Sequence, residues 1–371
     1  MAALDRKKAI MGLSGGVDSS AAALFLREKG YEVTGLFFDV RGDNDEGRRE
    51  AQRAAEQLGI DFIYKDVSRR FHDVVIRNFC TEYSSGRTPN PCVLCNPNIK
   101  FMTLLEEADR IGAYYIATGH YAKVRFSQAL DAWFVERAAS DERDQSYMLY
   151  RLPQNVLSRL LLPLAESRDK ADVRDKARVS GLANHDAKDS QEICFIDGDY
   201  KDYLKQAGTV CVPGDFIDIH GNIIGEHRGI INYTLGQRKG LGTSFGKRVF
   251  VIDIDAESNT VTLGSNEDLF RNHVISSHNF FTMTGSGELP ASMEGTEIRA
   301  KIRYAARPAE AILRHADKAM CASLEKARTA DGCGQFIVTA FKDRQRAATP
   351  GQSIVFYLDE KVIGGGIIEK A

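Results

Sequence analysis

The first half of the chain alternates short apolar runs with stretches in which apolar residues recur at helical spacing. The apolar runs predict strands at residues 7–13, 31–40, 61–67 and 114–120. The helical stretches lie between them, at residues 21–29, 46–59 and 101–113. Gly30 and Gly59 close the first two, as glycine commonly does at the end of a helix. This alternation predicts an α/β fold in which helices cover a parallel sheet.

The pattern changes near residue 210, where helical periodicity fades and hairpin signals begin. Apolar and polar residues alternate around turn-forming residues at 217–225, 248–264 and 351–368. A second domain boundary, which the sequence marks less clearly, lies near residue 283, beside the glycine-rich stretch "TGSGELP". We therefore expect three domains: a catalytic domain at 1–209, a small central domain at 210–282 and a C-terminal β domain at 283–371.

Composition narrows the class of protein. The chain has 371 residues, of which 43% are hydrophobic and 27% charged, as is usual for a globular protein. Its formal net charge is only −2, so an acidic polymer such as RNA would have to bind a local basic face. The sequence shows no membrane-length apolar run and no targeting pattern at its start, which predicts a cytoplasmic protein. In that setting its seven cysteines predict reduced, reactive thiols.

The stretch "SGGVDSS", residues 14–20, lies between the first strand and the first helix. Adjacent glycines allow main-chain N–H groups to approach a ligand, and a helix N-terminus favours anions, so the loop suits a phosphate. Asp18 beside that phosphate would require a cation such as Mg²⁺. The lysine of a kinase-type P-loop is missing here. The alternative is a tight turn whose serines cap the helix.

A second candidate site is "GRTPNPCVLCNPNIKF", residues 86–101, in which Cys92 and Cys95 have C-x-x-C spacing. Arg87 and Lys100 flank the two cysteines, and positive neighbours favour the thiolate form. A structural zinc half-site is the competing interpretation, although no second pair with similar spacing is present. Cys194, in "DSQEICFID", gives a weaker indication of a site.

Two further patterns concern binding. In "IRAKIRY", residues 298–304, apolar positions alternate with Arg299, Lys301 and Arg303, so one face of the predicted strand is basic. This face would either bind RNA or simply be exposed to solvent. His120 follows a predicted strand at the edge where the phosphate loop lies, and it is either a structural histidine or a contact residue.

The loop "SGGVDSS" resembles the PP-loop of ATP pyrophosphatases, which cleave ATP between its α- and β-phosphates. Eight ordered motifs together resemble the tRNA-specific 2-thiouridylases: "GLSGGVDSS", "GRTPNP-x-x-x-CN-x-x-IKF", "ATGHYA", "DQSYMLY", "ICFI", "YTLGQRKGLG", "KIRY" and "TPGQSIVFY". In that family ATP activates the wobble uridine of certain tRNAs, and a persulfide sulfur replaces the C2 oxygen. The resemblance implies a PP-loop domain, a central tRNA-contacting domain and a C-terminal β-barrel.

The resemblance also implies roles for individual residues. It makes Cys95 the nucleophile and Cys194 the persulfide carrier. Together with the strand ends, it implies an ATP and Mg²⁺ site formed by Gly12, Leu13, Ser14, Gly15, Gly16, Val17, Asp18, Ser19, Phe38 and Gly119. The target base would contact Asn90, Pro91 and Cys92, and the rest of the tRNA would contact His120, Arg143, Asp144, Gln145, Arg303, Tyr304 and Gln352. The implied partners are tRNAs for Lys, Glu and Gln and a sulfur-relay protein or cysteine desulfurase.

Cys92 departs from the family pattern, because many members have aspartate at this position. Its thiolate would either accept a proton, as proposed for that aspartate, or have no role. A third interpretation is that Cys92, Cys95 and Cys194 hold a [4Fe–4S] cluster that carries sulfide. Two other functions are also compatible with parts of the sequence: adenylation of a small molecule, and binding of RNA without catalysis.

Overall fold

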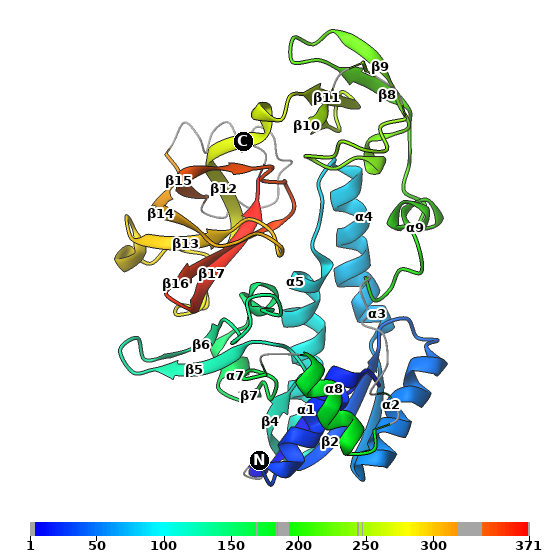
Figure 1. Cartoon of the computed structure of the whole chain (residues 1–371), viewed down its shortest axis with the longest axis vertical. Helices are drawn as coiled ribbons and strands as arrows, with labels where there is room; N and C mark the ends of the chain where they lie inside the picture. Colours follow the sequence, from blue (N-terminus) through cyan, green and yellow to red (C-terminus); the bar gives the residue numbers. More distant parts are fainter. Residues whose placement is uncertain are drawn as a thin grey trace. The chain divides into compact units, whose positions relative to one another are not determined.

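The computed structural model (Figure 1) divides into two compact units, each formed from several stretches of the chain. It describes residues 4–167, 170–182, 184, 193–242, 245–246, 248–317 and 336–369. Unit 1 comprises Met1–Val75, Cys92–Phe195 and Glu360–Ile363, and unit 2 comprises Ile76–Pro91, Ile196–Asp359 and Gly364–Ala371. The chain therefore passes between the units several times. The expected domain boundaries near residues 210 and 283 stay a prediction.

Unit 1 contains a parallel sheet with the strand order β3-β2-β1-β4-β7. Its strands are β1 (Asp5–Gly12), β2 (Glu32–Asp39), β3 (Asp61–Asp66), β4 (Ala113–Ala117) and β7 (Leu160–Leu161). The central strand β1 is fully buried along Ala9, Ile10 and Met11, as expected for a strand with neighbours on both sides and helices on its faces. The predicted parallel sheet is confirmed.

Helices connect and cover these strands. The main helices of unit 1 are α1 (Val17–Glu28), α2 (Asp45–Leu58), α6 (Phe101–Ile111) and α8 (Lys170–Val179), with shorter helices α3 (Ser68–Phe71), α5 (Pro91–Cys95) and α7 (Gln154–Leu157). Gly59 and Gly112 end α2 and α6 with left-handed backbone, so Gly59 acts as the sequence predicted. Helix α1 starts at Val17 and not at Ala21, because Gly16 is its N-cap and the polar residues that follow form its first turn.

The central part of unit 2 is a four-stranded sheet with the order β10-β11-β8-β9. These strands are β8 (Gly214–Ile217), β9 (Ile223–His227), β10 (Phe250–Asp255) and β11 (Thr260–Gly264), and the neighbouring helices are α4 (Arg77–Ser84) and α9 (Tyr200–Gln206). The pairs β8–β9 and β10–β11 are antiparallel, so the hairpins expected at 217–225 and 248–264 are confirmed.

A six-stranded barrel forms most of the remainder of unit 2, and only the first residues of its last described strand, Lys361–Ile363, are grouped with unit 1. Its strands are β12 (Phe270–Phe281), β13 (Glu297–Lys301), β14 (Ala309–His315), β15 (Ile337–Arg346), β16 (Ser353–Leu358) and β17 (Lys361–Ile368). They follow the order β12-β15-β14-β13-β16-β17, and pairing of β12 with β17 closes the barrel. The expected C-terminal barrel is confirmed, and it includes β12, which precedes residue 283.

Unit 1 also contains a hairpin that the sequence patterns did not predict, formed by β5 (Lys123–Ser127) and β6 (Ala132–Glu136). Glu136 pairs with Lys361, and the main-chain N–H of Arg137 donates to the carbonyl of Glu360. Residues 360–363 thus pack with unit 1 although they follow β16. No helix among the described residues is long and apolar enough to cross a membrane.

Candidate active site

The loop between β1 and α1 is shaped by two glycines. Gly15 has a φ of +81°, and a Cβ atom at this position would lie 2.8 Å from Cβ of Glu50 and 2.9 Å from the main-chain nitrogen of Ala51. Gly16 has extended backbone and caps the N-terminus of α1. The loop therefore requires glycine at position 15, and it ends at a helix N-terminus whose N–H groups favour an anion.

Two serines cross-link this loop. The main-chain N–H of Ser14 donates to Oγ of Ser19 at 3.2 Å, and the two hydroxyl oxygens are 3.1 Å apart. The hydroxyl of Ser19 donates in turn to the carbonyl of Gly16 at 3.0 Å. These bonds hold the loop in one conformation before any ligand binds, which reduces the entropy that binding would cost.

Residues from three strand ends meet beside the loop. A Cβ atom at Gly119, which follows β4, would lie 3.1 Å from the main-chain carbon and oxygen of Asp18. A Cβ atom at Gly12, the last residue of β1, would lie 3.4 Å from the ring of Phe38 in β2. The carboxyl ends of neighbouring parallel strands therefore bring these predicted nucleotide-binding residues together.

The residues around this loop fit a nucleotide with a divalent cation. Helix N-terminal N–H groups and serine hydroxyls can bind phosphate oxygens, and glycine at position 15 allows the loop to pack closely against Glu50 and Ala51. The carboxylate of Asp18, in the first turn of α1, is an oxygen ligand of the kind that Mg²⁺ prefers. Oδ1 of Asp18 also accepts a hydrogen bond from the hydroxyl of Tyr121 at 2.8 Å.

The structure brings the three candidate cysteines together in unit 1. Cys92 and Cys95 lie three residues apart on α5, so they share one side of the helix. Cys194 is close enough to both that a negative charge on one thiol raises the pKa of another. Cys92 and Cys194 are exposed, whereas Cys95 is partly buried. Sequence positions far apart thus form one cluster of thiols.

Burial, more than neighbouring charge, determines the protonation state of the Cys95 thiol. Desolvation raises the pKa of Cys95 to about 12, while the positive charge of Lys100 lowers it by less. Cys95 is therefore a neutral thiol near pH 7, although Lys100 favours the thiolate in the direction that the sequence predicted. Although Cys194 is exposed, desolvation by the protein atoms around it raises its pKa, against the opposing charges of Lys100 and Arg41.

A loop that sequence reasoning missed holds Cys194. The carbonyl of Cys194 accepts a hydrogen bond from Nε of Arg41 at 3.3 Å. The main chain of Arg41 is fixed in turn, because its N–H donates to the buried carboxylate of Asp39, which also accepts from Gly42 and Asn44. The signal available in the sequence was Asp39, at the end of the apolar strand β2, because a carboxylate that is buried requires several hydrogen-bond donors from the loop that follows.

Among the described residues, which include all three clustered cysteines, no group of three His, Cys, Asp or Glu side chains is arranged to hold a metal ion. The thiols interact electrostatically, but they do not form a ligand set with the geometry that a metal centre needs.

His120 lies next to the nucleotide loop and is neutral. Burial and the nearby charge of Lys100 lower its pKa well below the usual value. Its Nδ1 is 2.7 Å from the hydroxyl of Thr118, and its ring stacks on Phe101 with centroids 6.1 Å apart. A neutral, stacked imidazole suits a contact residue and not a proton acceptor that changes charge near pH 7.

The predicted tRNA contacts at 143–145 form an ordered loop. Asp144 is 3% exposed, and its carboxylate accepts from the main chain of Ala138 and from both the N–H and the hydroxyl of Ser146. The side chain of Asp144 therefore holds the loop, while Arg143 and Gln145 remain partly exposed. A contact between these residues and RNA stays a prediction.

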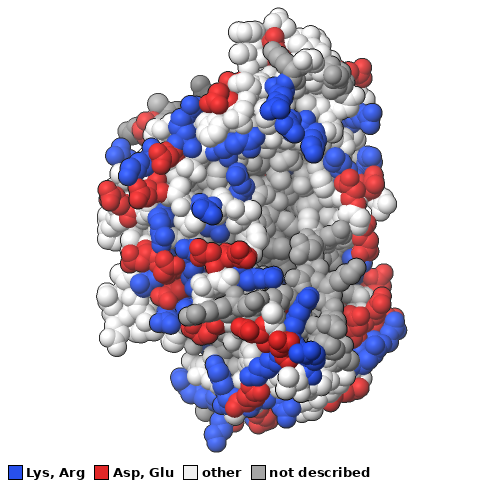
Figure 2. All heavy atoms as spheres, viewed as in Figure 1, with Lys and Arg blue, Asp and Glu red and all other residues white. Residues whose placement is uncertain are grey.

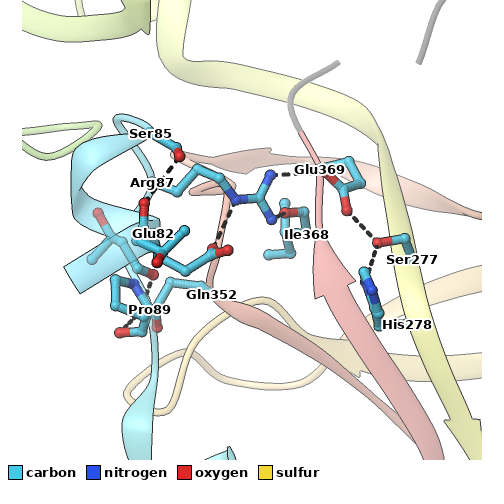
Figure 3. A network of polar contacts seen from close by, with 11 residues as sticks. Glu82, Ser85, Arg87, Pro89, Ser277, His278, Gln352, Ile368 and Glu369 are labelled. Atoms are coloured by element: carbon cyan, nitrogen blue, oxygen red, sulfur yellow. Dashed lines mark hydrogen bonds and ion pairs between the residues drawn. The ribbon is translucent and has the colours of Figure 1, made fainter. Parts of the chain in front are cut away.

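In unit 2, an ion-pair network joins the segment before Asn90 to the end of the chain (Figure 3). Arg87 donates from Nε to Glu82 at 2.7 Å and from Nη1 to Glu369 at 2.8 Å. Burial disfavours the charge of Arg87, but the two carboxylates outweigh that effect and raise its pKa. Glu369 also accepts from the hydroxyl of Ser277.

The same segment is bound to the turn before β16. Nε2 of Gln352 donates to the carbonyls of Thr88 and Pro89 at 2.9 and 3.2 Å, and the N–H of Thr88 donates to the carbonyl of Pro350 at 2.8 Å. The motifs "GRTPNP" and "TPGQS" are thus neighbours in unit 2. Gln352 positions the residues directly before the predicted base contacts Asn90 and Pro91.

Strand β13 agrees only in part with the prediction of one apolar and one basic face. Along β13, Ile298 and Ala300 are buried and Arg299 is partly exposed, but Lys301 is only 6% exposed, so the prediction that it lies on the solvent face is wrong. The cation of Lys301 lies 5.7 Å from the ring centroid of Tyr304. Arg303 and Tyr304 are exposed.

Basic and acidic side chains are intermixed over the face shown in Figure 2, and basic ones predominate only locally. The small net charge of −2 agrees with this distribution. Any binding of a polyanion would therefore depend on particular residues and not on the overall field of the protein.

The parallel sheet and its glycine-rich loop define a nucleotide-binding domain of the PP-loop type, and a family model described as tRNA methyl transferase HUP domain matches residues 7–198. Models described as tRNA methyl transferase PRC-barrel domain and aminomethyltransferase beta-barrel domain match residues 201–265 and 337–368. The chain belongs to the family of tRNA-specific 2-thiouridylases.

Relatives in this family match the chain over almost its whole length. The tRNA-specific 2-thiouridylase MnmA 1 of Caldanaerobacter subterraneus is 43% identical, with 98% of each chain covered. The tRNA-specific 2-thiouridylase MnmA of Clostridioides difficile is 40% identical over 98% of this chain and 99% of its own. That of Clostridium perfringens is 42% identical, with 99% of both chains covered.

Proposed function

We propose that this chain is an ATP-dependent sulfurtransferase that replaces the C2 oxygen of a tRNA wobble uridine with sulfur and releases AMP and pyrophosphate. The observation that carries the proposal is the meeting of Cys95 and Cys194 in the unit that contains the PP-loop. The full-length relatives, which are named tRNA-specific 2-thiouridylases, support the same reaction.

The uridine oxygen must first be converted into a leaving group, because a carbonyl oxygen does not depart when sulfur attacks. ATP with Mg²⁺ supplies this activation by transferring AMP to the C2 oxygen. In this chain the N-terminus of α1 and the hydroxyls of Ser14 and Ser19 would hold the phosphates, and Asp18 would bind the cation. These groups position and neutralise the triphosphate.

Sulfur transfer then uses two cysteines. The terminal sulfur of a Cys194 persulfide attacks C2, and AMP leaves with the former uridine oxygen. The thiolate of Cys95 attacks Sγ of Cys194, so a disulfide forms and the electron pair of the broken S–S bond stays on the new thiocarbonyl sulfur. An external thiol reduces the disulfide, and a sulfur-relay protein or cysteine desulfurase supplies the next persulfide. The charge of Lys100 favours the Cys95 thiolate that this step requires.

The tRNA would be held by several groups. Asn90, Pro91 and Cys92 lie a few positions before Cys95 in the chain, which supports contact with the target base. The neutral ring of His120 and the partly exposed Arg143 and Gln145 support contacts near the nucleotide, and Arg303, Tyr304 and Gln352 provide exposed or partly exposed groups in unit 2. The resemblance of the sequence favours tRNAs for Lys, Glu and Gln.

We favour a persulfide over a [4Fe–4S] cluster as the sulfur carrier. The described residues offer no three-ligand arrangement around Cys92, Cys95 and Cys194, and this supports the persulfide route. Substitution of Cys92 by aspartate separates the two routes. Iron-free, aerobically purified Cys92→Asp enzyme keeps appreciable activity if a persulfide carries sulfur. Wild type that holds about four irons per chain and stops when they are chelated would establish the cluster instead.

A direct assay tests the function itself. The protein is incubated with ATP, Mg²⁺, unmodified tRNA and a persulfide donor, and the nucleosides are analysed by mass spectrometry. We expect 2-thiouridine and stoichiometric AMP, and neither from Cys194→Ser. AMP formation that needs a small acceptor and no tRNA would identify a small-molecule adenylating enzyme. Bound tRNA without AMP or thiouridine would identify an RNA-binding protein.

A further inference from the structure

Tyr121 lies between the nucleotide loop and the loop at 143–145, and the roles assigned above do not include it. Its side chain is 3% exposed and packs in a hydrophobic cluster with Met11, Val17 and Ala117. From that fixed position its hydroxyl donates to Oδ1 of Asp18 at 2.8 Å. The ring supplies packing, while the hydroxyl supplies one specific contact to the site.

That contact restricts the carboxylate which the nucleotide site needs. A carboxylate in the first turn of a helix can rotate, and each rotation moves its oxygen atoms relative to a bound cation. A donor on a buried, well-packed ring stabilises one orientation of Asp18, and a hydrogen bond to an ionised acceptor is stronger than one between neutral groups. Removing the hydroxyl would therefore leave the orientation of Asp18 less defined.

The main chain of Tyr121 is held by Gln145. The N–H of Tyr121 donates to Oε1 of Gln145 at 3.1 Å, and the N–H of Gln145 donates to the carbonyl of Tyr121 at 2.8 Å. Gln145 itself follows Asp144, whose buried carboxylate fixes the loop. Continuous contacts thus run from the loop at 143–145 through Tyr121 to Asp18.

We propose that Tyr121 is a positioning residue for Asp18, and that Gln145 acts on the Mg²⁺-nucleotide site through Tyr121 even when RNA is absent. The inference rests on the proposed function only in assigning Mg²⁺ to Asp18. It differs from a role of Gln145 as an RNA contact, because an RNA contact has no effect on nucleotide binding in the absence of RNA.

The test measures binding and not turnover. Calorimetry gives the dissociation constant of α,β-methylene-ATP with Mg²⁺, without RNA, for wild type and Tyr121→Phe. The substitution keeps the packed ring, and we expect binding to weaken about tenfold or more, as for loss of a hydrogen bond to a charged group. Tyr115→Phe, which removes the same atom from β4, is the matched control and should bind as wild type does.

A double-mutant cycle tests the second half of the proposal. Gln145→Leu removes the side-chain acceptor and should weaken analogue binding in the same direction, and Tyr121→Phe should cost less in that background than in wild type. Wild-type affinity of Tyr121→Phe, or no binding of the analogue by wild type, overturns the role of Tyr121. An unchanged affinity of Gln145→Leu, or additive effects, overturns the link through Gln145. Thiouridine analysis is independent of this assay, so failure of the proposed function would be recognised separately.

Discussion

Arg87 offers the sharpest test of how unit 2 is held together. Replacing Arg87 by methionine keeps much of the apolar stem but removes the cation between Glu82 and Glu369. Both carboxylates then lose a hydrogen-bonded partner, at 2.7 and 2.8 Å respectively. The carbonyl of Ile368, which accepts from Nη2 at 3.3 Å, loses a donor as well. We expect unit 2 to be clearly destabilised.

The magnitude follows from burial. Glu369 keeps 6% of its side-chain surface exposed, whereas Glu82 keeps 21% and Arg87 18%. Removing one partner of a buried ion pair costs about 3–5 kcal/mol. Because water still reaches Glu82, we expect the lower end, about 3 kcal/mol. With a urea m-value of about 3 kcal/mol per molar, the midpoint of unit 2 would fall by roughly 1 M.

Hydrogen exchange measured by mass spectrometry in increasing urea follows the two units separately. Peptides from β12 and from residues 364–368 of β17, which belong to unit 2, report on the barrel, while the single tryptophan, Trp133 on β6, reports on unit 1 by fluorescence. Lys342→Gln is the matched control, because it breaks an exposed ion pair of 2.9 Å with Glu310 in the same barrel. Its transition should stay that of wild type. Unchanged exchange in the barrel peptides of the Arg87→Met protein would refute this account of the network.

Three further predictions concern the other sites. Gly15→Ala should abolish AMP formation, because its Cβ would overlap Glu50 and Ala51. Gly16→Ala, whose Cβ would meet only Oγ of Ser14 at 3.4 Å, should stay folded by circular dichroism. An active Gly15→Ala protein would contradict the first of these expectations. Arg303→Ala should weaken binding of all substrate tRNAs alike and reduce the salt slope of filter binding by about one counterion, and an unchanged slope would argue against a phosphate contact. Iodoacetamide should label the exposed Cys92 before Cys95, whose labelling rate should rise about tenfold per pH unit because its pKa is about 12; equal labelling rates at pH 7 by peptide mass spectrometry would exclude this.

The sequence predicted features that depend on local pattern. Strands β1 to β4 have continuous apolar runs, Gly59 ends α2 in left-handed conformation, and the hairpins of unit 2 alternate around turn residues. The nucleotide loop was also predictable, because two glycines and an aspartate between a strand and a helix restrict what the loop can bind. Such features depend on neighbours within a few residues.

Features that depend on distant contacts were not predictable from pattern. Burial sets the pKa of Cys95, and burial follows from the fold and not from the charge of Lys100 beside it in sequence. The alternation of β13 put Lys301 on the solvent face, but its environment in the barrel buries it. Likewise, Tyr121 and Gln145 belong to different motifs, and only the fold shows that they are hydrogen-bonded.

The network around Arg87 has a consequence for biosynthesis. Arg87 and Glu369 are separated by 282 positions in the chain, and β17, which closes the barrel on β12, is the last of the described strands. A chain growing on the ribosome therefore carries Arg87 without Glu369 until β17 has been synthesised. The parallel sheet of unit 1 has most of its residues long before that point. Nascent chains stalled before residue 360 should accordingly show a protease-resistant nucleotide domain and an unprotected barrel.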